Sequence, residues 1–393
     1  MNQLLSEGSD YVARARSLGP VLAAAADEIE RSRELPASIV SRLIDNGFFR
    51  LLQPHSLDGA ELDPMTYIRV VEEIASHDAS TGWCVEQANG CSMVAAFLDP
   101  EVAQEIFGPP DGIVAWGPVG PAELTAVPGG YRLTGAWNFA SGSHHATWLG
   151  AHVVTHSADG TPLSRADGGE ILQTLLFPKS RPTMTDIWHV VGLRGTGSDR
   201  YSVTDLFIPE RYTVLRDPKI APHQSGRLYC FSSSLYACGV AAVALGIARG
   251  MVADFTELAT ERTPRGSRQR LCENQVIQMQ RAQAEARLGS ARAYLLGGLT
   301  EIWETVGETG ELSLEHNAAI RLASTWSIDQ AREVVNTLYH SAGATAIFDD
   351  RPFERRFRDM HTASQQAQGR QAHYETIGRV LFGLAPDTPM FVF

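Results

Sequence analysis

Lysine is nearly absent from this chain. Lys179 and Lys219 are its only lysines, and the other cationic side chains are arginines. Acidic residues outnumber basic ones, and the formal net charge is -12. Binding to nucleic acid requires clustered lysine and arginine that neutralise phosphates. The composition therefore argues against nucleic acid as a partner.

The chain also has few cysteines and no hydrophobic run of membrane-spanning length. Its five cysteines are odd in number and form no CxxC pair, which argues against a disulfide framework or a zinc site and suits reduced thiols in the cytoplasm. The first residues lack the basic and apolar regions of a signal peptide. The longest apolar stretch, Leu235 to Ala248, is shorter than the roughly 20 residues that cross a bilayer. We expect it to form a tightly packed buried helix in a cytoplasmic protein without membrane contact.

The predicted elements divide the chain into three parts. Residues 1–110 have helical spacing, with one helix over Pro36 to Asn46 and proline-led starts such as Asp63-Pro64. Residues 111–214 consist of short β-rich runs between turn residues. Residues 215–393 contain two long helical patterns, Arg270 to Gly298 and Leu314 to Ala342. The predicted fold class is α+β, with an N-terminal helical domain, a central antiparallel β-barrel or sandwich, and a C-terminal four-helix bundle.

The usual nucleotide and metal motifs are missing. The glycines of Gly192 to Gly197 have the wrong spacing for a nicotinamide fingerprint, and a strand follows them where a helix would be needed. His144, His145 and His152 could be imagined as metal ligands, but no carboxylate lies near them in the sequence. We therefore expect no metal site.

Two short segments hold the candidate functional residues. Trp137 to Ser143 joins aromatic and hydroxyl side chains at a turn, and His361 lies on a predicted C-terminal helix. One interpretation is a hairpin with a core tryptophan, and a helical histidine that is only a satisfied polar residue. The other is that backbone amides and the Ser141 hydroxyl hydrogen-bond a flat heteroaromatic ring, while His361 accepts a proton near neutral pH.

Several motifs together resemble the two-component flavin-dependent monooxygenases of acyl-CoA dehydrogenase fold, and most closely the steroid-derived phenol hydroxylases and p-hydroxyphenylacetate hydroxylases. The resemblance covers nearly the whole chain. The motifs that carry it are Gly47-Phe48-Phe49, Leu51 to Pro54, Ala79 to Trp83, Trp137 to Gly142, Val190 to Ser198, Val203 to Pro209, Ser341 to Ala344, and Arg358 to His361.

This resemblance implies a reduced flavin, FMNH2 or FADH2, that a separate NAD(P)H:flavin reductase supplies. The flavin would react with O2 to form a C4a-hydroperoxide and hydroxylate a phenolic or aromatic small molecule. Ser141 stands where the family places a hydroxyl near the flavin N5. Trp137, Asn138 and Phe139 would line the ring through backbone contacts, and Gly142 would permit its close approach.

The resemblance also implies that His361 binds the substrate and deprotonates its hydroxyl, and that Ser141 and His361 converge on one bound flavin. The related dehydrogenases use a glutamate about eight residues after the Arg-Asp pair, but Ala367 stands there in this chain. Glu375, about two helical turns further on, is expected at the surface or in packing.

Three further residues are candidates by resemblance. Arg262 would contact a flavin phosphate across a subunit interface, or is an ordinary surface arginine. Gly343 matches a glycine-rich loop that approaches the cofactor. Trp116 faces flavin or substrate, or is a core tryptophan. The fold usually assembles as a homotetramer through its C-terminal helices, and we expect the same here.

Four functions follow from these features. Hydroxylation of an aromatic carbon is the first, because a phenol-activating base suits it. The second is flavin-dependent oxygenation of an amino-sugar nitrogen or a sulfur. Acyl-CoA dehydrogenation is the third, and Ala367 argues against it. The fourth is a catalytically silent flavin-binding or scaffolding protein, which Ser141 and His361 disfavour.

Overall fold

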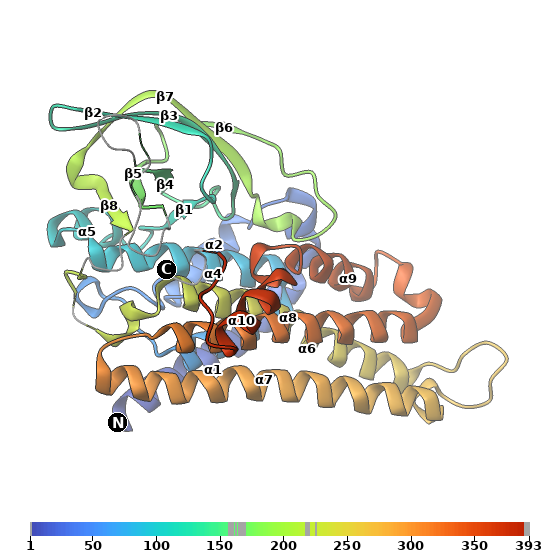
Figure 1. Ribbon diagram of the computed structural model, residues 1–393. Coiled ribbons are helices and arrows are strands. Elements are labelled where there is room, and N and C mark those ends of the chain that lie inside the picture. The colour runs from blue at the N-terminus through green and yellow to red at the C-terminus, as the bar shows by residue number, and fades with distance from the viewer. Residues whose placement is uncertain are drawn as a thin grey trace.

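A computed structural model describes residues 2–155, 161, 163, 170–216, 221–224 and 226–388. Helices come first, then a strand-rich middle region, then long helices that lie beneath it (Figure 1). The helices are α1 Asn2–Ser32, α2 Ala37–Asp45, α3 Pro64–His77, α4 Ala79–Ser92, α5 Pro100–Phe107, α6 Ser232–Glu261, α7 Gln275–Thr309, α8 Leu314–Ala342, α9 Pro352–Ala363 and α10 Ala372–Leu381. The strands are β1 Val114–Trp116, β2 Ala122–Val127, β3 Gly130–Ala140, β4 Trp148–Val154, β5 Leu172–Pro178, β6 Thr183–Thr185, β7 Asp199–Pro209 and β8 Thr213–Arg216.

The apolar stretch predicted to be a buried helix forms the centre of α6, and this prediction is confirmed. Every residue from Leu235 to Ala248 that carries a large or medium apolar side chain is fully buried. In the described ranges, α6 is the one helix long and apolar enough to cross a membrane, but 89% of its most apolar window lies inside the protein. Gly246 lets α3 approach closely, because a Cβ there would come within 2.5 Å of the Glu72 carbonyl oxygen.

The middle region forms two four-stranded sheets, with strand orders β1-β4-β5-β8 and β2-β3-β7-β6. Of the predicted antiparallel barrel or sandwich, the barrel is wrong, because the two sheets are not closed, and one pairing differs, because β1 pairs with β4 in parallel. Short edge strands explain the open ends: β1 and β6 each have 3 residues. Apolar residues of both sheets, including Leu133, Leu175 and Tyr201, share one core.

Local sequence signals explain most helix boundaries. The Asp63 side chain caps α3 by accepting a hydrogen bond from Thr66 N at 3.0 Å, as its position before Pro64 predicts. Helix α8 has the predicted bounds. Helix α7 starts later than predicted because Asn274 caps it, and it continues to Thr309, where Gly310 ends it with a φ of +74°.

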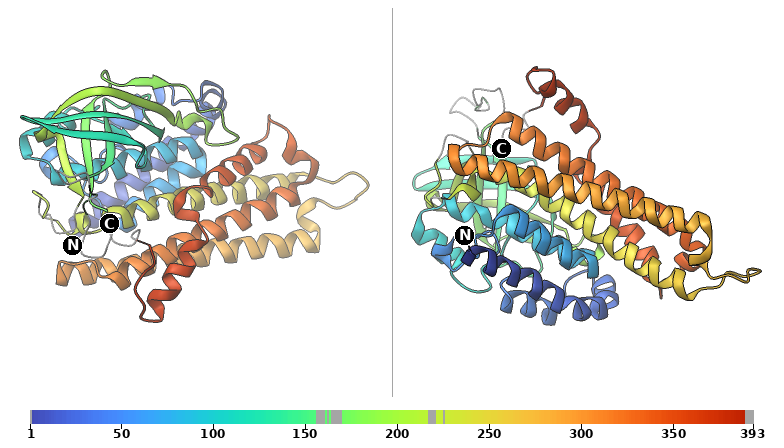
Figure 2. Two further views of the ribbon diagram at one scale, coloured as in Figure 1. Left: turned by 45° about the horizontal axis from the view of Figure 1, so that its top comes forward. Right: turned by 90° about the horizontal axis from the view of Figure 1, so that it is seen from below.

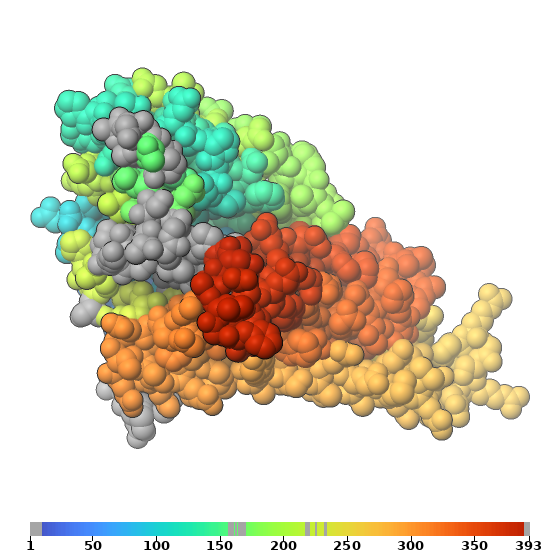
Figure 3. Space-filling model, viewed as in Figure 1, coloured from blue at the N-terminus to red at the C-terminus, as the bar shows by residue number. Residues whose placement is uncertain are grey.

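The last helices connect the two halves of the molecule. Helix α9 packs on α6 and α8 and lies beside the β-domain, whereas the hairpin tip between α6 and α7 projects away from it (Figures 1 and 2). The space-filling view shows the same tip standing beyond the rest of the surface (Figure 3).

Candidate active site

The segment Trp137 to Ser143 is the end of β3 and the turn that follows it. The turn begins at Ser141, because Trp137 and Ala140 still pair with β7, with an irregularity of the ladder between them. The Trp137 side chain is only 1% exposed, stacks on Tyr201 at 5.4 Å, and donates from Nε1 to the His152 carbonyl oxygen. It has the core position that the hairpin interpretation predicts, so only its backbone remains for contact with a ligand.

Phe139 combines an unusual backbone with an exposed ring. Its φ is +62°, a left-handed conformation that is strained for a bulky residue, and its side chain is 56% exposed. The ring stands edge-on to Trp188 at 6.0 Å. Next to it, Asn138 Oδ1 accepts a hydrogen bond from Arg200, and Gly142 has a φ of +76°. Strain of this kind is concentrated at functional sites, and the exposed rings offer a flat apolar surface.

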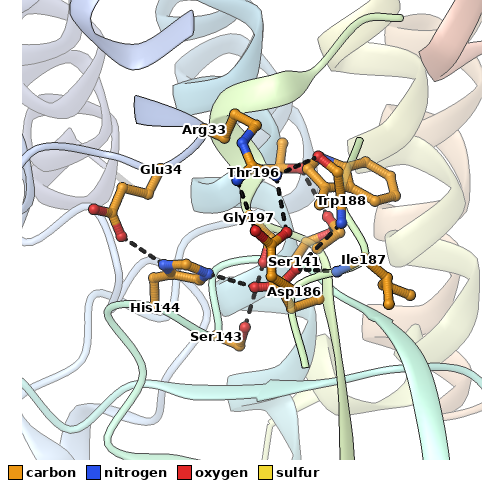
Figure 4. Close-up of polar contacts among 12 residues, drawn as sticks. Arg33, Glu34, Ser141, Ser143, His144, Asp186, Ile187, Trp188, Thr196 and Gly197 are labelled. Carbon is orange, nitrogen blue, oxygen red and sulfur yellow. Dashed lines mark hydrogen bonds and ion pairs between the residues drawn. The ribbon is translucent and has the colours of Figure 1, made fainter. Parts of the chain in front are cut away.

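The Ser141 hydroxyl belongs to a buried hydrogen-bond network. It accepts from Trp83 Nε1 at 3.1 Å and lies 2.6 Å from the Ser198 hydroxyl. The Ser198 hydroxyl lies 2.7 Å from that of Thr196, which donates to the Leu193 carbonyl oxygen at 2.9 Å. Figure 4 shows Ser141 and Thr196 in this arrangement. Each hydroxyl has one proton, and that of Thr196 is donated to the Leu193 carbonyl oxygen, so Ser198 donates to Thr196 and Ser141 donates to Ser198. The Ser141 oxygen therefore faces a ligand as an acceptor.

The Arg-Asp pair of α9 holds the loop that carries these hydroxyls. Asp359 is 4% exposed and accepts a hydrogen bond from Leu193 N at 2.6 Å, while Arg358 donates to the Val191 carbonyl oxygen. Gly192 makes this approach possible, because a Cβ there would lie 2.3 Å from the Arg358 carbonyl oxygen. A continuous chain of hydrogen bonds thus joins Ser141 to α9.

His361 lies on α9, two residues beyond Asp359, and faces a different neighbour. It is half-buried, its ring packs on Phe357 at 4.3 Å, and its Nε2 is 2.9 Å from Asn336 Oδ1. An amide oxygen only accepts, so Nε2 carries the hydrogen and Nδ1 keeps a free lone pair. Burial, and secondly Arg332, lower the pKa of His361 and favour this neutral form. No hydrogen bond or ring contact among the described residues joins His361 directly to Ser141.

The position of a dehydrogenase base holds no carboxylate. Ala367 lies in a short 3-10 turn, Ala367–Gly369, and its carbonyl oxygen accepts a hydrogen bond from His373. Glu375 is exposed on α10, as the sequence predicts.

Arg262 and Gly343 lie together, but away from Ser141. Arg262 donates to the Ala342 carbonyl oxygen at 2.8 Å, next to Gly343, whose φ of +60° and ψ of -147° end α8. Arg262 follows the end of α6, and Gly343 follows the end of α8. The structure therefore pairs these two candidates with each other, and among the described residues no hydrogen bond joins either of them to Ser141.

Trp116 lies on the other sheet. Its ring stands edge-on to His152 at 4.9 Å, and the Arg216 guanidinium lies 5.5 Å from its centre. The Trp116 side chain is partly buried and packs at the edge of a small core beneath β1.

His144 bridges two carboxylates, which corrects the expectation that none lies near it. Its Nδ1 contacts Glu34 and its Nε2 is 2.8 Å from Asp199 Oδ2 (Figure 4). These acids come from distant parts of the chain, so local sequence could not reveal them. Within the described residues, no group of three histidine, cysteine or acidic side chains is arranged to hold a metal.

Sequence reasoning also missed Trp83, Ser198 and Asn336 as partners of the candidate residues. Trp83 and Ser198 belong to motifs that carry the family resemblance, and that was the available signal. Asn336 has no such signal, because its proximity to His361 depends on how α8 packs against α9.

Two models of one protein family match this chain. The model "Acyl-CoA dehydrogenase, N-terminal domain" matches residues 16–109, and "Acyl-CoA dehydrogenase, C-terminal domain" matches residues 238–370. Indole-3-acetate monooxygenase of Pseudomonas putida is 28% identical over 91% of this chain and 90% of its own length. The flavin-dependent monooxygenase oxygenase subunit HsaA of Mycobacterium tuberculosis is 28% identical over 98% of both chains.

Solved structures agree with these relatives. HsaA from M. tuberculosis superimposes with a TM-score of 0.86 at 26% identity, covering 98% of this chain and 99% of that one. XiaF from Streptomyces sp., in complex with FADH2 and glycerol, shares the fold with a TM-score of 0.90 at 24% identity, covering 99% and 98% of the two chains. This chain therefore belongs to the acyl-CoA dehydrogenase family, and its relatives over nearly its whole length include the oxygenase subunit of a flavin-dependent monooxygenase.

Proposed function

We propose that the protein hydroxylates an aromatic carbon of a phenolic small molecule, with reduced flavin from a separate NAD(P)H:flavin reductase. Relatives named as oxygenase subunits or components support the separate reductase, and one is named an FADH(2)-dependent resorcinol hydroxylase. The observation that carries the proposal is the hydrogen-bond chain from Ser141 through the 193–198 loop to Asp359, because it fixes His361's helix to the turn after β3.

The residues around Ser141 fit a flavin. The exposed ring of Phe139 supplies apolar surface, Gly142 leaves the backbone approachable, and the Ser141 hydroxyl supplies a polar contact to the heteroaromatic edge. Backbone groups of Trp137 and Asn138 would add contacts. Bound reduced flavin supplies the electrons that activate O2. The chain's own task at this position is to orient the ring and exclude water from it.

His361 would act on the substrate. Its free Nδ1 accepts the proton of a substrate hydroxyl, and its Nε2–H stays on Asn336, so the imidazole keeps its orientation while it works. Deprotonation raises the electron density of the aromatic ring at the carbon to be oxygenated. A positioned base typically contributes about 10²–10⁴-fold to the rate.

Arg262 and Gly343 would serve a second copy of the chain. One guanidinium nitrogen of Arg262 binds the Ala342 carbonyl oxygen, which leaves further N–H donors for a flavin phosphate. The nearby side chains of Ile347 and Phe348 are exposed and apolar. We infer a cytoplasmic homotetramer in which this end of the helices meets the flavin of a neighbour. Trp116 remains a proposed substrate contact.

The test is anaerobic mixing of the protein with FADH2 or FMNH2, followed by oxygen and resorcinol. A near-ultraviolet absorbance transient and a hydroxylated product are expected. His361→Ala should keep the transient and flavin affinity but release hydrogen peroxide without product, while the exposed control Glu375→Gln should behave like wild type. Loss of the transient in His361→Ala would refute the assigned role. Reduction of the oxidised flavin by an acyl-CoA would instead support the dehydrogenase alternative.

A further inference from the structure

A second polar cluster lies one helical turn from Ser141. Trp83 and Gln87 are four residues apart, so they share one face of α4. Trp83 Nε1 donates to Ser141, and Gln87 Nε2 donates to the Tyr236 hydroxyl on α6 at 3.0 Å. If Ser141 marks the flavin, Tyr236 lies close to the region that a substrate must occupy.

Tyr236 also contacts the segment that follows His361. Its hydroxyl accepts a second hydrogen bond from Gln366 Nε2 at 3.0 Å. The Gln366 amide is itself held in place, because its Oε1 accepts from Gln368 N at 2.6 Å. The Tyr236 phenol therefore links α4, the helix that carries Trp83 and Gln87, to the segment that follows α9.

The Tyr236 hydroxyl proton lacks a good acceptor. Its one contact is Gln87 Oε1 at 3.4 Å, longer than the usual range of about 2.5–3.0 Å for O–H···O bonds. The same amide already donates its nitrogen to the phenol. Although α6 is a core helix, the Tyr236 side chain remains partly exposed, whereas its sequence neighbours Leu235 and Ala237 are fully buried.

Burial opposes charge on the groups of this cluster. Glu86, beside Gln87, is 0% exposed, and burial raises its pKa well above the ordinary carboxyl value. Its Oε1 has no hydrogen-bond partner. Burial likewise raises the pKa of Tyr236, and the cluster consists of a phenol, two amides and a buried carboxyl group without a cationic partner among the hydrogen bonds of the described residues. Such a set suits a neutral hydrogen-bonding group better than a carboxylate, whose desolvation it would not compensate.

We propose that Tyr236 is a substrate-positioning residue whose hydroxyl donates to an uncharged oxygen of the aromatic substrate, with Gln87 and Gln366 holding the phenol in place. This inference rests on the proposed function, and it adds that the substrate's polar substituent is neutral.

Indole-3-acetamide and indole-3-acetate are suitable probes, because they have nearly the same shape and differ in charge. Anaerobic calorimetric titration of the protein with FADH2 bound should show the amide binding at least tenfold more tightly. Tyr236→Phe removes only the hydroxyl and should weaken amide binding about threefold to tenfold, the effect of one neutral hydrogen bond. Flavin affinity should change less than twofold. Tyr229→Phe is the matched control, because the Tyr229 hydroxyl has no hydrogen-bond partner.

Gln366→Met provides a second variant on a partly exposed side chain, and it should lower the affinity for the amide in the same direction. Equal or tighter binding of the carboxylate, no binding of either compound, or unchanged amide affinity in Tyr236→Phe overturns the inference. A missing absorbance transient in wild type would instead overturn the proposed function, and the binding measurements would remain interpretable.

Discussion

Asp359 connects α9 to the 190–198 loop, and removing its carboxyl group should change the position of Ser141. Asp359→Ala leaves the Leu193 N–H without its 2.6 Å acceptor, and Leu193 is itself buried. An unpaired buried donor costs about 1–3 kcal/mol. We expect that loss in the free energy of unfolding, measured with guanidinium, and a fall in flavin affinity of about fivefold to 150-fold if the loop must be re-ordered on binding. Asp359→Asn keeps an acceptor and should retain both properties near pH 6.

The same residue predicts a pH dependence. Burial raises the pKa of Asp359 to about 7, whereas the unfolded chain has an aspartate pKa of about 3.9. The unfolded state therefore releases this proton at lower pH than the folded state. The contribution of Asp359 to stability is present at acid pH and is lost as pH rises from about 4 to 7. A difference of about 3 pKa units corresponds to about 4 kcal/mol.

Unfolding curves of wild type and Asp359→Asn between pH 5 and 8 test this directly. The variant has no proton to release at this position, so its stability should fall less with pH than that of wild type. The buried Asp78, whose pKa is also raised by burial, contributes to the slope of both proteins. Parallel slopes would refute the reasoning, since they would mean that Asp359 is ionised throughout.

Three further predictions concern the same chain of contacts. Ser141→Ala leaves Trp83 Nε1 without an acceptor and should lower the free energy of unfolding by about 1–3 kcal/mol. It should also lower the flavin affinity measured by calorimetry, and an unchanged flavin affinity would contradict the role of Ser141. Burial and Arg332 lower the pKa of His361, so His361 should stay active as a base below pH 6.5. Asn336→Asp places a carboxylate beside the ring, favours the imidazolium, and should move the acid limb of kcat/KM to higher pH. Gly192→Ala places a Cβ 2.3 Å from the carbonyl oxygen of Arg358 and should lower the melting temperature by several degrees, whereas an unchanged value would mean that the loop moves freely.

Much of the fold could be predicted from the sequence because its signals are local. The apolar run of α6, the Asp63 cap and the bounds of α8 each depend on neighbouring residues, and each prediction is confirmed. The parallel β1–β4 pair could not be predicted from local patterns. Strand alternation gives the same pattern whichever direction a neighbour runs, and β1 has only 3 residues.

The site was predictable as a set of motifs but not as a set of contacts. Ser141 and His361 could be named, yet Asn336 and the two acids around His144 could not, because each is brought into place by packing between distant elements. Trp137 shows the opposite case. The hairpin interpretation predicted a core tryptophan from its local pattern, and the side chain is a core residue of the β-domain.

The intermediate loop explains why these motifs occur together. Among the described residues no hydrogen bond joins Ser141 to α9 directly, but both bond to residues 193–198 within a span of six positions. The loop can reach both only because Gly192 permits contact with the Arg358 backbone on one side and its hydroxyls face Ser141 on the other. A change in the turn after β3, in the 193–198 loop or in α9 should therefore displace the other two. The Arg-Asp pair thus positions the loop, and in the proposed site its effect would reach the flavin through the hydroxyls of Thr196 and Ser198.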